Sequence, residues 1–505
     1  MKDILIDKAR GCMIGGAAGD ALGYTVEFSS LDSIFKQYGS SGITAYSPDS
    51  KGIARFSDDT QMTLFTAEGL LDAAQKGESA NTDAVTRCIE KAYLAWFETQ
   101  TGFQLPIPSS WLTHVRDLWA RRAPGNTCLS ALSNLKAGSP VHNDSKGCGA
   151  VMRVAPIGIF YAANTEQSNM QDAKREAARV AADSARITHL NDLSTLASVF
   201  TTLLIFGCMR THVIDRLTFR SIIASALSET LAAVATDSVK TEKFISIIQK
   251  ALDLAGSSGS DRDAIRELGE GWVAEETAAI AVFCVMRYIR DFEGCLVAAV
   301  NHDGDSDSTG AVAGNIIGAI LGYTGIPEKF RKRLELHDLI LSVADDLVGA
   351  SGETQLRERY SAHRPYGIDE KLKFINSMRF TPENITELGP DDIFVFGSNL
   401  AGHHAGGAAR VARQRFGAVE GQGVGMQGQS YAIPTMQGGV ETIKPYVDDF
   451  IEFAGNCDQN TFYVTRIGCG IAGFTDEEIA PLFRDALNLY NVRLPESFVR
   501  ILLNE

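Results

Sequence analysis

The sequence predicts a multidomain fold in which an all-α domain is followed by a smaller α/β domain. The chain has 505 residues, of which 45% are apolar and 22% are charged, an ordinary globular composition with enough length for two or three domains. Helical periodicity continues almost without interruption to about residue 350. After that point the sequence carries apolar runs that end in glycine, which are typical of buried strands.

Eight segments before residue 350 carry apolar residues at helical spacing. They are Asp59–Ala74, Asn81–Glu98, Met170–Ser184, Leu193–Met209, Phe219–Ala235, Thr241–Ala255, Ala274–Tyr288 and Phe292–Ala299. Glycine, proline and serine gather between them in short stretches such as 122–126 and 256–261, which predict loops inside one domain. We therefore expect residues 1–350 to form one all-helical domain.

Glycine also recurs at every fourth residue in two further segments. The two series are Gly11, Gly15, Gly19 and Gly23, and Gly310, Gly314, Gly318 and Gly322. Each series lines one ridge of a helix, where a glycine costs about 1 kcal/mol relative to alanine. Because close packing of helix backbones would offset this cost, we expect both helices to lie very near a neighbour.

After residue 350 the sequence first becomes polar and then alternates between short apolar runs and helical patterns. We expect a connector at 351–375 and a compact α/β domain at 376–505. The expected elements are strands at Asp392–Gly397, Thr461–Gly468 and Phe498–Leu503 and helices at about 406–416, 440–454 and 476–491.

Glycine-rich segments follow the first two of these strands, at Ser398–Gly402 and Cys469–Gly473. In parallel sheets, ligands bind beyond the carboxyl ends of the strands. Gly406 and Gly407 then open a helix, whose free N–H groups would suit a phosphate. Ordinary turns use the same glycines, so both interpretations stay open.

Two acidic clusters stand far apart in the all-helical part, at Ser57-Asp58-Asp59-Thr60 and at 303–309. Taken alone, the first is typical of a helix N-terminus that Ser57 caps. In the second, Asp303, Asp305 and Asp307 alternate with small residues, and such crowded carboxylates repel unless a cation or solvent screens them. Together the clusters predict a site for hard divalent cations such as Mg²⁺, Ca²⁺ or Mn²⁺.

The charge and the ends of the chain limit the partners and the compartment. The net charge of −15 argues against a general nucleic-acid surface. Nine cysteines form no C-x-x-C pair, and the acidic N-terminus lacks the pattern of a signal peptide, so we expect a cytoplasmic protein with reduced thiols. The apolar run Thr309–Tyr323 is too short to span a bilayer and contains Asn315, so we expect no membrane segment.

Residues 8–345 resemble the ADP-ribosylglycohydrolase family, which includes the dinitrogenase reductase-activating glycohydrolases. The motifs that carry this resemblance occur in the family's order: Gly19–Gly23 with Glu27, Ser57–Thr63, Gly147–Arg153, Thr188-His189 and His302–Gly314. The resemblance implies metal-dependent enzymes with an all-α ADP-ribosylglycohydrolase-like helical domain and a binuclear Mg²⁺ centre, in which Mn²⁺ is an alternative ion.

The resemblance also implies the residues of the site. The implied metal ligands are Ser57, Asp58, Asp59, Asp305, Asp307 and Ser308, and the implied ADP-ribose contacts are Gly147, Cys148, Gly149 and His189. Many relatives have threonine where Ser57 and Ser308 stand, a change that keeps an oxygen ligand, and some have asparagine where Cys148 stands. His189 is assigned by resemblance alone, and a structural histidine is the alternative.

The implied chemistry suits these residue types. Cleavage at the anomeric carbon of ribose passes through an oxocarbenium-like state, which requires a fixed sugar and a positioned water or acid–base group. Glu27 is our candidate for handling the water or the proton of the leaving group. The small residues of the turn at 147–149 would admit a diphosphate.

Residues 390–495 look like a divergent macrodomain, the three-layer α/β module that binds ADP-ribose. The matching residues are Asn399, Gly406, Gly407, Gly468, Gly470 and Phe474. We therefore expect a Mg²⁺-dependent hydrolase that removes ADP-ribose from a modified protein or nucleic acid, with a C-terminal ADP-ribose-binding module. A non-catalytic ADP-ribose reader and a Mg²⁺-dependent nucleotide phosphohydrolase are the alternatives. The sequence leaves open the linkage, the oligomeric state and whether the C-terminal module only recruits substrate or hydrolyses a second linkage.

Overall fold

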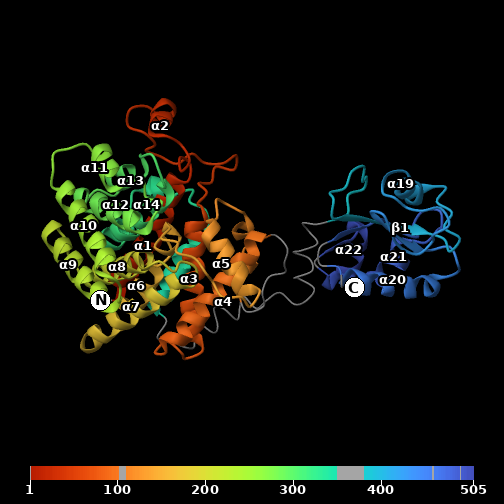
Figure 1. Ribbon diagram of the computed structural model, residues 1–505, viewed down its shortest axis with the longest axis horizontal. Helices are drawn as coiled ribbons and strands as arrows, with labels where there is room; N and C mark the ends of the chain where they lie inside the picture. The colour runs from red at the N-terminus through yellow and green to blue at the C-terminus, as the bar shows by residue number, and fades with distance from the viewer. Residues whose placement is uncertain are drawn as a thin grey trace. The chain divides into compact units, whose positions relative to one another are not determined.

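A computed structural model describes residues 2–101, 110–349, 380–455, 457, 460–489 and 491–504. The described residues fall into a helical unit, within residues 2–349, and a unit built around a small sheet, within residues 380–504 (Figure 1). The predicted connector at 351–375 lies outside the described residues.

The helical unit contains the eight predicted helices, whose ends differ from the prediction by no more than three residues. Its α-helices are α1 (Lys2–Gly23), α2 (Leu31–Tyr38), α3 (Asp58–Gln75), α4 (Thr82–Thr101), α5 (Asn126–Lys136), α6 (Ala155–Ala163), α7 (Met170–Arg186), α8 (Asp192–Arg210), α9 (Arg216–Ala233), α10 (Ser238–Ala255), α11 (Asp261–Leu268), α12 (Ala274–Arg287), α13 (Phe292–Val300), α14 (Ser306–Leu321), α15 (Glu328–Arg331) and α16 (His337–Gly349).

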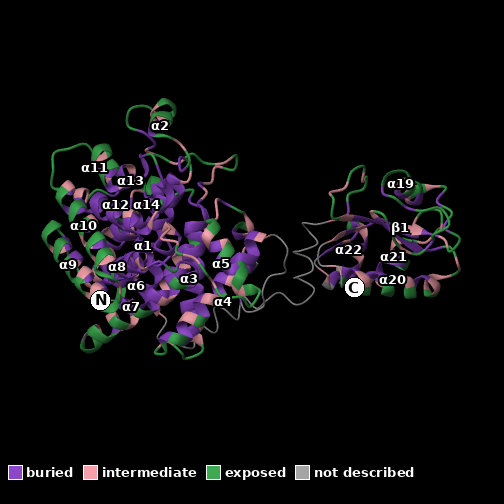
Figure 2. Ribbon diagram, in the orientation of Figure 1, coloured by how far each residue is buried: buried purple, intermediate pink, exposed green. Residues whose placement is uncertain are grey.

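The two glycine series are the contact faces of α1 and α14, two buried helices at the centre of this unit (Figure 2). A Cβ atom added at Gly15 would lie 2.3 Å from the carbonyl oxygen of Gly314, and one at Gly23 would lie 2.1 Å from that of Ser306. The predicted close packing is thus confirmed. It sets the C-terminal end of α1 beside the N-terminal end of α14, where the second acidic cluster lies.

Among the described residues, α8 is the one helix that is long and apolar enough to cross a membrane. Within the helical unit, 89% of the residues in its apolar stretch are buried. Core helices of globular proteins share this length and composition, so these properties alone do not distinguish a membrane span from a core helix.

The second unit has a five-stranded sheet in the order β2-β3-β1-β4-β5. Its strands are β1 (Asp392–Ser398), β2 (Gly425–Gln427), β3 (Ser430–Pro434), β4 (Thr461–Val464) and β5 (Val492–Arg493), and its α-helices are α19 (Gly407–Arg415), α20 (Val440–Gly455), α21 (Asp476–Ile479) and α22 (Glu496–Asn504). Strands β3, β1, β4 and β5 run parallel, and β2 is antiparallel to β3.

Alternate residues of β1 enter two separate apolar cores. Ile393 and Val395 pack with residues of α20 and α22, whereas Phe394 and Phe396 pack with residues of α19. Helices therefore cover both faces of the sheet.

The predicted strand at Phe498–Leu503 is wrong, because this segment lies inside helix α22. Among the side chains of α22 that the structure describes, the buried ones are Phe498, Val499 and Leu502. Their spacing places them on one face of a helix. A short apolar run does not by itself separate a strand from a helix, since it fits the period of both.

The predicted helix at 476–491 is broken after α21 into the 3₁₀ turns Ala480–Phe483 and Asp485–Asn488. Pro481 has no N–H to donate, which favours this interruption. The strand predicted to reach Gly468 ends at Val464, and the remaining residues form the loop that follows it.

Candidate active site

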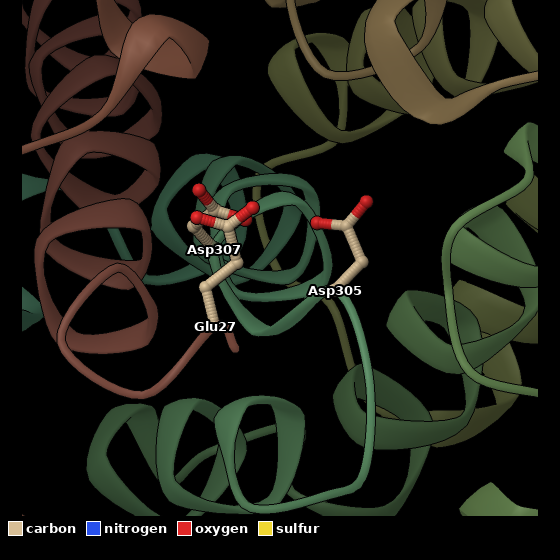
Figure 3. A group of neighbouring side chains, drawn as sticks. All are labelled: Glu27, Asp305 and Asp307. Carbon is tan, nitrogen blue, oxygen red and sulfur yellow. The ribbon is translucent and has the colours of Figure 1, made fainter. Parts of the chain in front are cut away.

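Three buried carboxylates meet where α1 and α14 come together (Figure 3). Ligand oxygens of Glu27, Asp305 and Asp307 all lie within 4.8 Å of one another. Glu27 follows α1, Asp305 caps α14 by accepting a hydrogen bond from the N–H of Ser308 at 3.2 Å, and Asp307 lies in the first turn of that helix. Within the described part of the chain, Glu27 Oε2 has no hydrogen-bond partner.

The first acidic cluster forms the N-terminus of α3 and interacts with this group. Ser57 caps the helix, since its hydroxyl accepts a hydrogen bond from the N–H of Asp59 at 3.2 Å. Burial and the charge of Asp307 raise the pKa values of both Asp58 and Asp59 well above the usual range. The predicted cap is therefore confirmed, and the two carboxylates of the capped turn interact electrostatically with Asp307 of the second cluster.

The crowding of these acids fits a bound divalent cation. Burial, then the charges of Asp307 and Asp305, raise the pKa of Glu27 to about 10, and burial with Asp307 raises the pKa of Asp305 as well. Like Glu27 Oε2, Asp59 Oδ2 is buried without a partner among the residues that the structure describes. Oxygen donors that repel one another and lack hydrogen bonds suit a hard ion such as Mg²⁺ or Mn²⁺.

The other predicted metal ligand, Ser308, follows the acid group on α14. Its backbone N–H donates to Asp307 Oδ1 at 2.8 Å, which fixes that carboxylate against the helix. Its hydroxyl lies 3.9 Å from the sulfur of Met152 and is buried.

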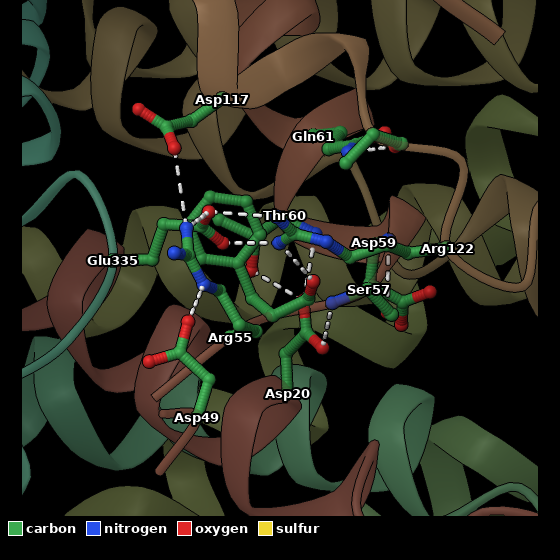
Figure 4. A network of polar contacts seen from close by, with 12 residues as sticks. Asp20, Asp49, Arg55, Ser57, Asp59, Thr60, Gln61, Asp117, Arg122 and Glu335 are labelled. Carbon is green, nitrogen blue, oxygen red and sulfur yellow. Dashed lines mark hydrogen bonds and ion pairs between the residues drawn. The ribbon is translucent and has the colours of Figure 1, made fainter. Parts of the chain in front are cut away.

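Asp20 is a residue of the site that sequence reasoning missed, although it lies inside the quoted Gly19–Gly23 motif. It is fully buried on α1 and accepts hydrogen bonds from the N–H groups of Ser57 at 2.7 Å and Thr60 at 2.9 Å (Figure 4). Burial and Asp307 raise its pKa to about 7. Its signal in the sequence was a lone carboxylate within the apolar, glycine-rich stretch 11–23.

The turn at 147–149 borders the same carboxylates. The thiol of Cys148 donates to Asp305 Oδ2 at 2.7 Å, and the N–H of Cys148 donates to the carbonyl oxygen of Trp272 at 3.2 Å. A side chain with sulfur therefore contacts one of the predicted metal ligands directly.

His189 packs behind this turn against both of its glycines, and at Gly149 the sulfur of Cys128 also limits the room. A Cβ atom added at Gly147 would lie 3.3 Å from Nε2 of His189, and one at Gly149 would lie 3.0 Å from its Cε1. Burial and the positive charge of Arg153 lower the pKa of His189 to about 3, so the imidazole is neutral. Small residues are needed here to seat this ring.

An exposed aromatic pair lies at the edge of the acid group. Phe28 follows Glu27 and is 76% exposed, and Trp272, next to Cys148, is 39% exposed. The two rings stack with centroids 6.0 Å apart and planes 22° apart. Large aromatic side chains in contact with solvent beside a buried polar site are suited to holding a planar group of a ligand.

In the second unit, the predicted residues gather in the loops after β1 and β4. The side-chain amide of Asn399 closes the first loop through two hydrogen bonds to the backbone of His403. Asn399 Oδ1 accepts from the N–H of His403 at 3.1 Å, and Asn399 Nδ2 donates to the carbonyl oxygen of His403 at 3.0 Å. A Cβ atom added at Gly406 would lie 3.0 Å from Ile471 Cδ1, so the two loops lie side by side.

The glycines of these loops differ in what surrounds them. Gly407 and Gly468 have φ values of 54° and 74°, in the left-handed region that favours glycine. A Cβ atom at Gly468 would lie 3.4 Å from the ring of Phe474, whereas one at Gly470 would meet no atom within 4 Å. Gly470 therefore faces open space.

Comparison with known proteins places the helical part in a family. The sequence profile of the ADP-ribosylglycohydrolases matches residues 1–357. An uncharacterized protein of Archaeoglobus fulgidus is 29% identical over 354 residues, which cover 68% of this chain and 96% of that protein. ADP-ribosyl-[dinitrogen reductase] glycohydrolase of Rhodospirillum rubrum is 25% identical, over 65% of this chain and 91% of that protein. ADP-ribosylhydrolase ARH3 of Bos taurus is 22% identical, over 65% of this chain and 89% of that protein.

Proposed function

Because the chain belongs to the ADP-ribosylglycohydrolase family, we propose that it removes ADP-ribose from a modified macromolecule by hydrolysing the bond at the anomeric carbon of the ribose. Hydrolysis of a glycosidic bond is what the family and the names of the relatives support. The modified group, on protein or nucleic acid, is the open part of this proposal.

The observation that carries the proposal is the convergence of Glu27, Asp305 and Asp307, three buried carboxylates from segments far apart in the sequence. Two Mg²⁺ ions, or Mn²⁺, would supply positive charge to orient the ribose hydroxyls. The residues that would hold them are Ser57, Asp58, Asp59, Asp305, Asp307 and Ser308.

Glu27 is the residue we assign to proton transfer or water positioning. Its Oε2 is buried and lacks a hydrogen bond within the described residues, so it is available to a water molecule or a leaving group. From this position it would pass a proton to the leaving atom or take one from the attacking water. Phe28 and Trp272 would hold a planar part of the substrate at the edge of the site.

For the second unit, we propose a macrodomain-like role in binding ADP-ribose without metal. The support is the pair of adjacent glycine-rich loops at the carboxyl ends of β1 and β4, together with the N-terminus of α19. Free N–H groups at such positions favour a diphosphate. Its role would be to recruit ADP-ribosylated substrate to the hydrolase.

An assay with a panel of ADP-ribosylated substrates, linked through arginine, serine and a nucleic-acid end, tests the hydrolase. We expect free ADP-ribose to appear with Mg²⁺ and to stop appearing with EDTA. Release of inorganic phosphate instead would identify a nucleotide phosphohydrolase. Binding without any release, on every linkage, would identify a reader and contradict the proposal.

A further inference from the structure

Glu335 is a buried carboxylate that two arginines share (Figure 4). Its side chain is 2% exposed and accepts hydrogen bonds from Arg122, with Nη2 at 2.7 Å, and from Nη1 of Arg55. It lies between α15 and α16, far from α3 in the sequence, and no motif in the sequence singled it out.

The two arginines hold the segment that leads into α3. Arg122 Nη1 donates to the carbonyl oxygen of Phe56 at 2.8 Å, and the carbonyl oxygen of Arg122 accepts from the N–H of Asp58 at 3.1 Å. Arg55 belongs to the segment itself, and its Nε donates to Asp49 at 2.8 Å. The residue between these contacts is Ser57, the cap of α3.

The backbone around Glu335 is tied to the same segment. The N–H of Ala54 donates to the carbonyl oxygen of Arg333 at 2.7 Å, and the N–H of Glu335 donates back to the carbonyl oxygen of Ala54 at 3.0 Å. Arg333 and Leu336 have φ values of 68° and 52°, which residues other than glycine rarely adopt. These two strained residues flank Glu335, whose side chain is buried.

We propose that Glu335 is a positioning residue for the metal site. It would act through Arg122 and Arg55 to fix residues 54–58, so that Ser57, Asp58 and Asp59 keep their oxygens aimed at a bound cation. Asp20 holds the same helix end from the other side, through the N–H groups of Ser57 and Thr60. The inference rests on the proposed function for the cation itself.

The test compares Glu335→Gln with Glu328→Gln in the full chain. The substitution at 335 keeps the shape and removes the charge that Arg122 and Arg55 share, whereas Glu328 is an exposed carboxylate nearby in sequence that pairs with Lys332. Mn²⁺ binding to the metal-free protein is measured by electron paramagnetic resonance, and the Mg²⁺ concentration for half-maximal hydrolysis is measured separately. We expect Glu335→Gln to weaken both by about tenfold or more, as for other residues that orient metal ligands, and Glu328→Gln to change neither.

Two further variants keep the outcome decisive. Glu335→Asp retains a carboxylate and is expected to recover part of the Mn²⁺ affinity, which a role in packing alone would not predict. If Glu335→Gln does not fold, Arg55→Gln replaces it, since Arg55 is partly exposed and bonds both Glu335 and Asp49. A folded variant with wild-type Mn²⁺ affinity but a lower melting temperature overturns the inference. Failure of the wild-type chain to bind Mn²⁺ would instead overturn the proposed metal site.

Discussion

A Cβ atom added at Gly19 would lie 1.9 Å from the carbonyl oxygen of Gly310. This contact between α1 and α14 is too close for any residue larger than glycine, and the next residue on α1 is Asp20. Because Asp307 lies in the first turn of α14, the same contact sets the charge of Asp307 close enough to raise the pKa of Asp20. The glycine ridge therefore assembles the acidic site as well as the core.

Gly19→Ala should destabilise the helical unit, because the added methyl group would push α1 away from α14. We expect the free energy of unfolding, from urea denaturation, to fall by about 2–3 kcal/mol. Gly256→Ala is the matched control, since a Cβ atom there would make an ordinary contact of 3.5 Å with the carbonyl oxygen of Asp253. Equal stability of the two variants would contradict the packing argument.

Asp305→Ala and Glu27→Gln should separate metal binding from turnover. The first removes a carboxylate from the group of three and should abolish both hydrolysis and the stabilisation by Mg²⁺. The second should lower the single-turnover rate by about 10²–10⁴-fold while ADP-ribose still binds. Rapid-quench product assays measure the single-turnover rate, and calorimetry measures the binding of ADP-ribose. Full single-turnover activity of Glu27→Gln would show that Glu27 has no part in the mechanism.

The metal-free protein should lose stability as the pH rises. Unfolded carboxyl groups titrate near ~4, whereas the folded pKa is about 7 for Asp20 and about 10 for Glu27, through burial and Asp307 in both cases. Between these values the folded protein binds more protons than the unfolded chain, so the free energy of unfolding falls with rising pH.

The measurement is the melting temperature in EDTA from about pH 5 to about pH 8, repeated with Mg²⁺. We expect the stabilisation by Mg²⁺ to grow with pH, because the cation must displace protons from its ligands. Asp20→Asn should flatten the pH dependence in EDTA. A melting temperature that rises with pH in EDTA would show that the crowded acids do not govern stability.

Trp272→Ala should weaken substrate binding more than it slows the reaction. The exposed ring lies beside the acid group rather than in it, so we expect KM to rise about five- to tenfold with little change in kcat. Val239→Ala on α10, which is 74% exposed and makes none of the contacts of the site described above, is the control. An unchanged KM would show that the aromatic pair takes no part in binding the substrate.

Gly470→Trp should block ADP-ribose binding by the second unit without unfolding it, because a Cβ atom there would meet no atom of the described residues within 4 Å. Calorimetry on the full chain in EDTA, where the first site lacks metal, isolates this event. Gly455→Trp at the end of α20 is the control, where a Cβ atom would make only a 3.5 Å contact with Leu489. If the folded wild-type chain binds no ADP-ribose in EDTA, the hypothesis that the second unit binds ADP-ribose as a macrodomain does is wrong.

Much of the fold follows from local patterns in the sequence. The eight helices were predicted because their apolar residues repeat with the period of a helix, and β1 was predicted because its apolar run is bounded by glycine and polar residues. Elements whose pattern is too short to show a period failed, as at Phe498–Leu503, where packing against the sheet selects a helix.

The sequence by itself determined the chemistry on offer: two clusters of carboxylates, a capping serine, glycines spaced for close helix packing and a family pattern that joins them. The tertiary structure decided which groups meet. It brought Glu27 to Asp305 and Asp307, put Asp20 under the start of α3 and aimed Glu335 at two arginines. Contacts between residues hundreds of positions apart leave no local period or spacing in a chain, because they depend on how whole helices pack.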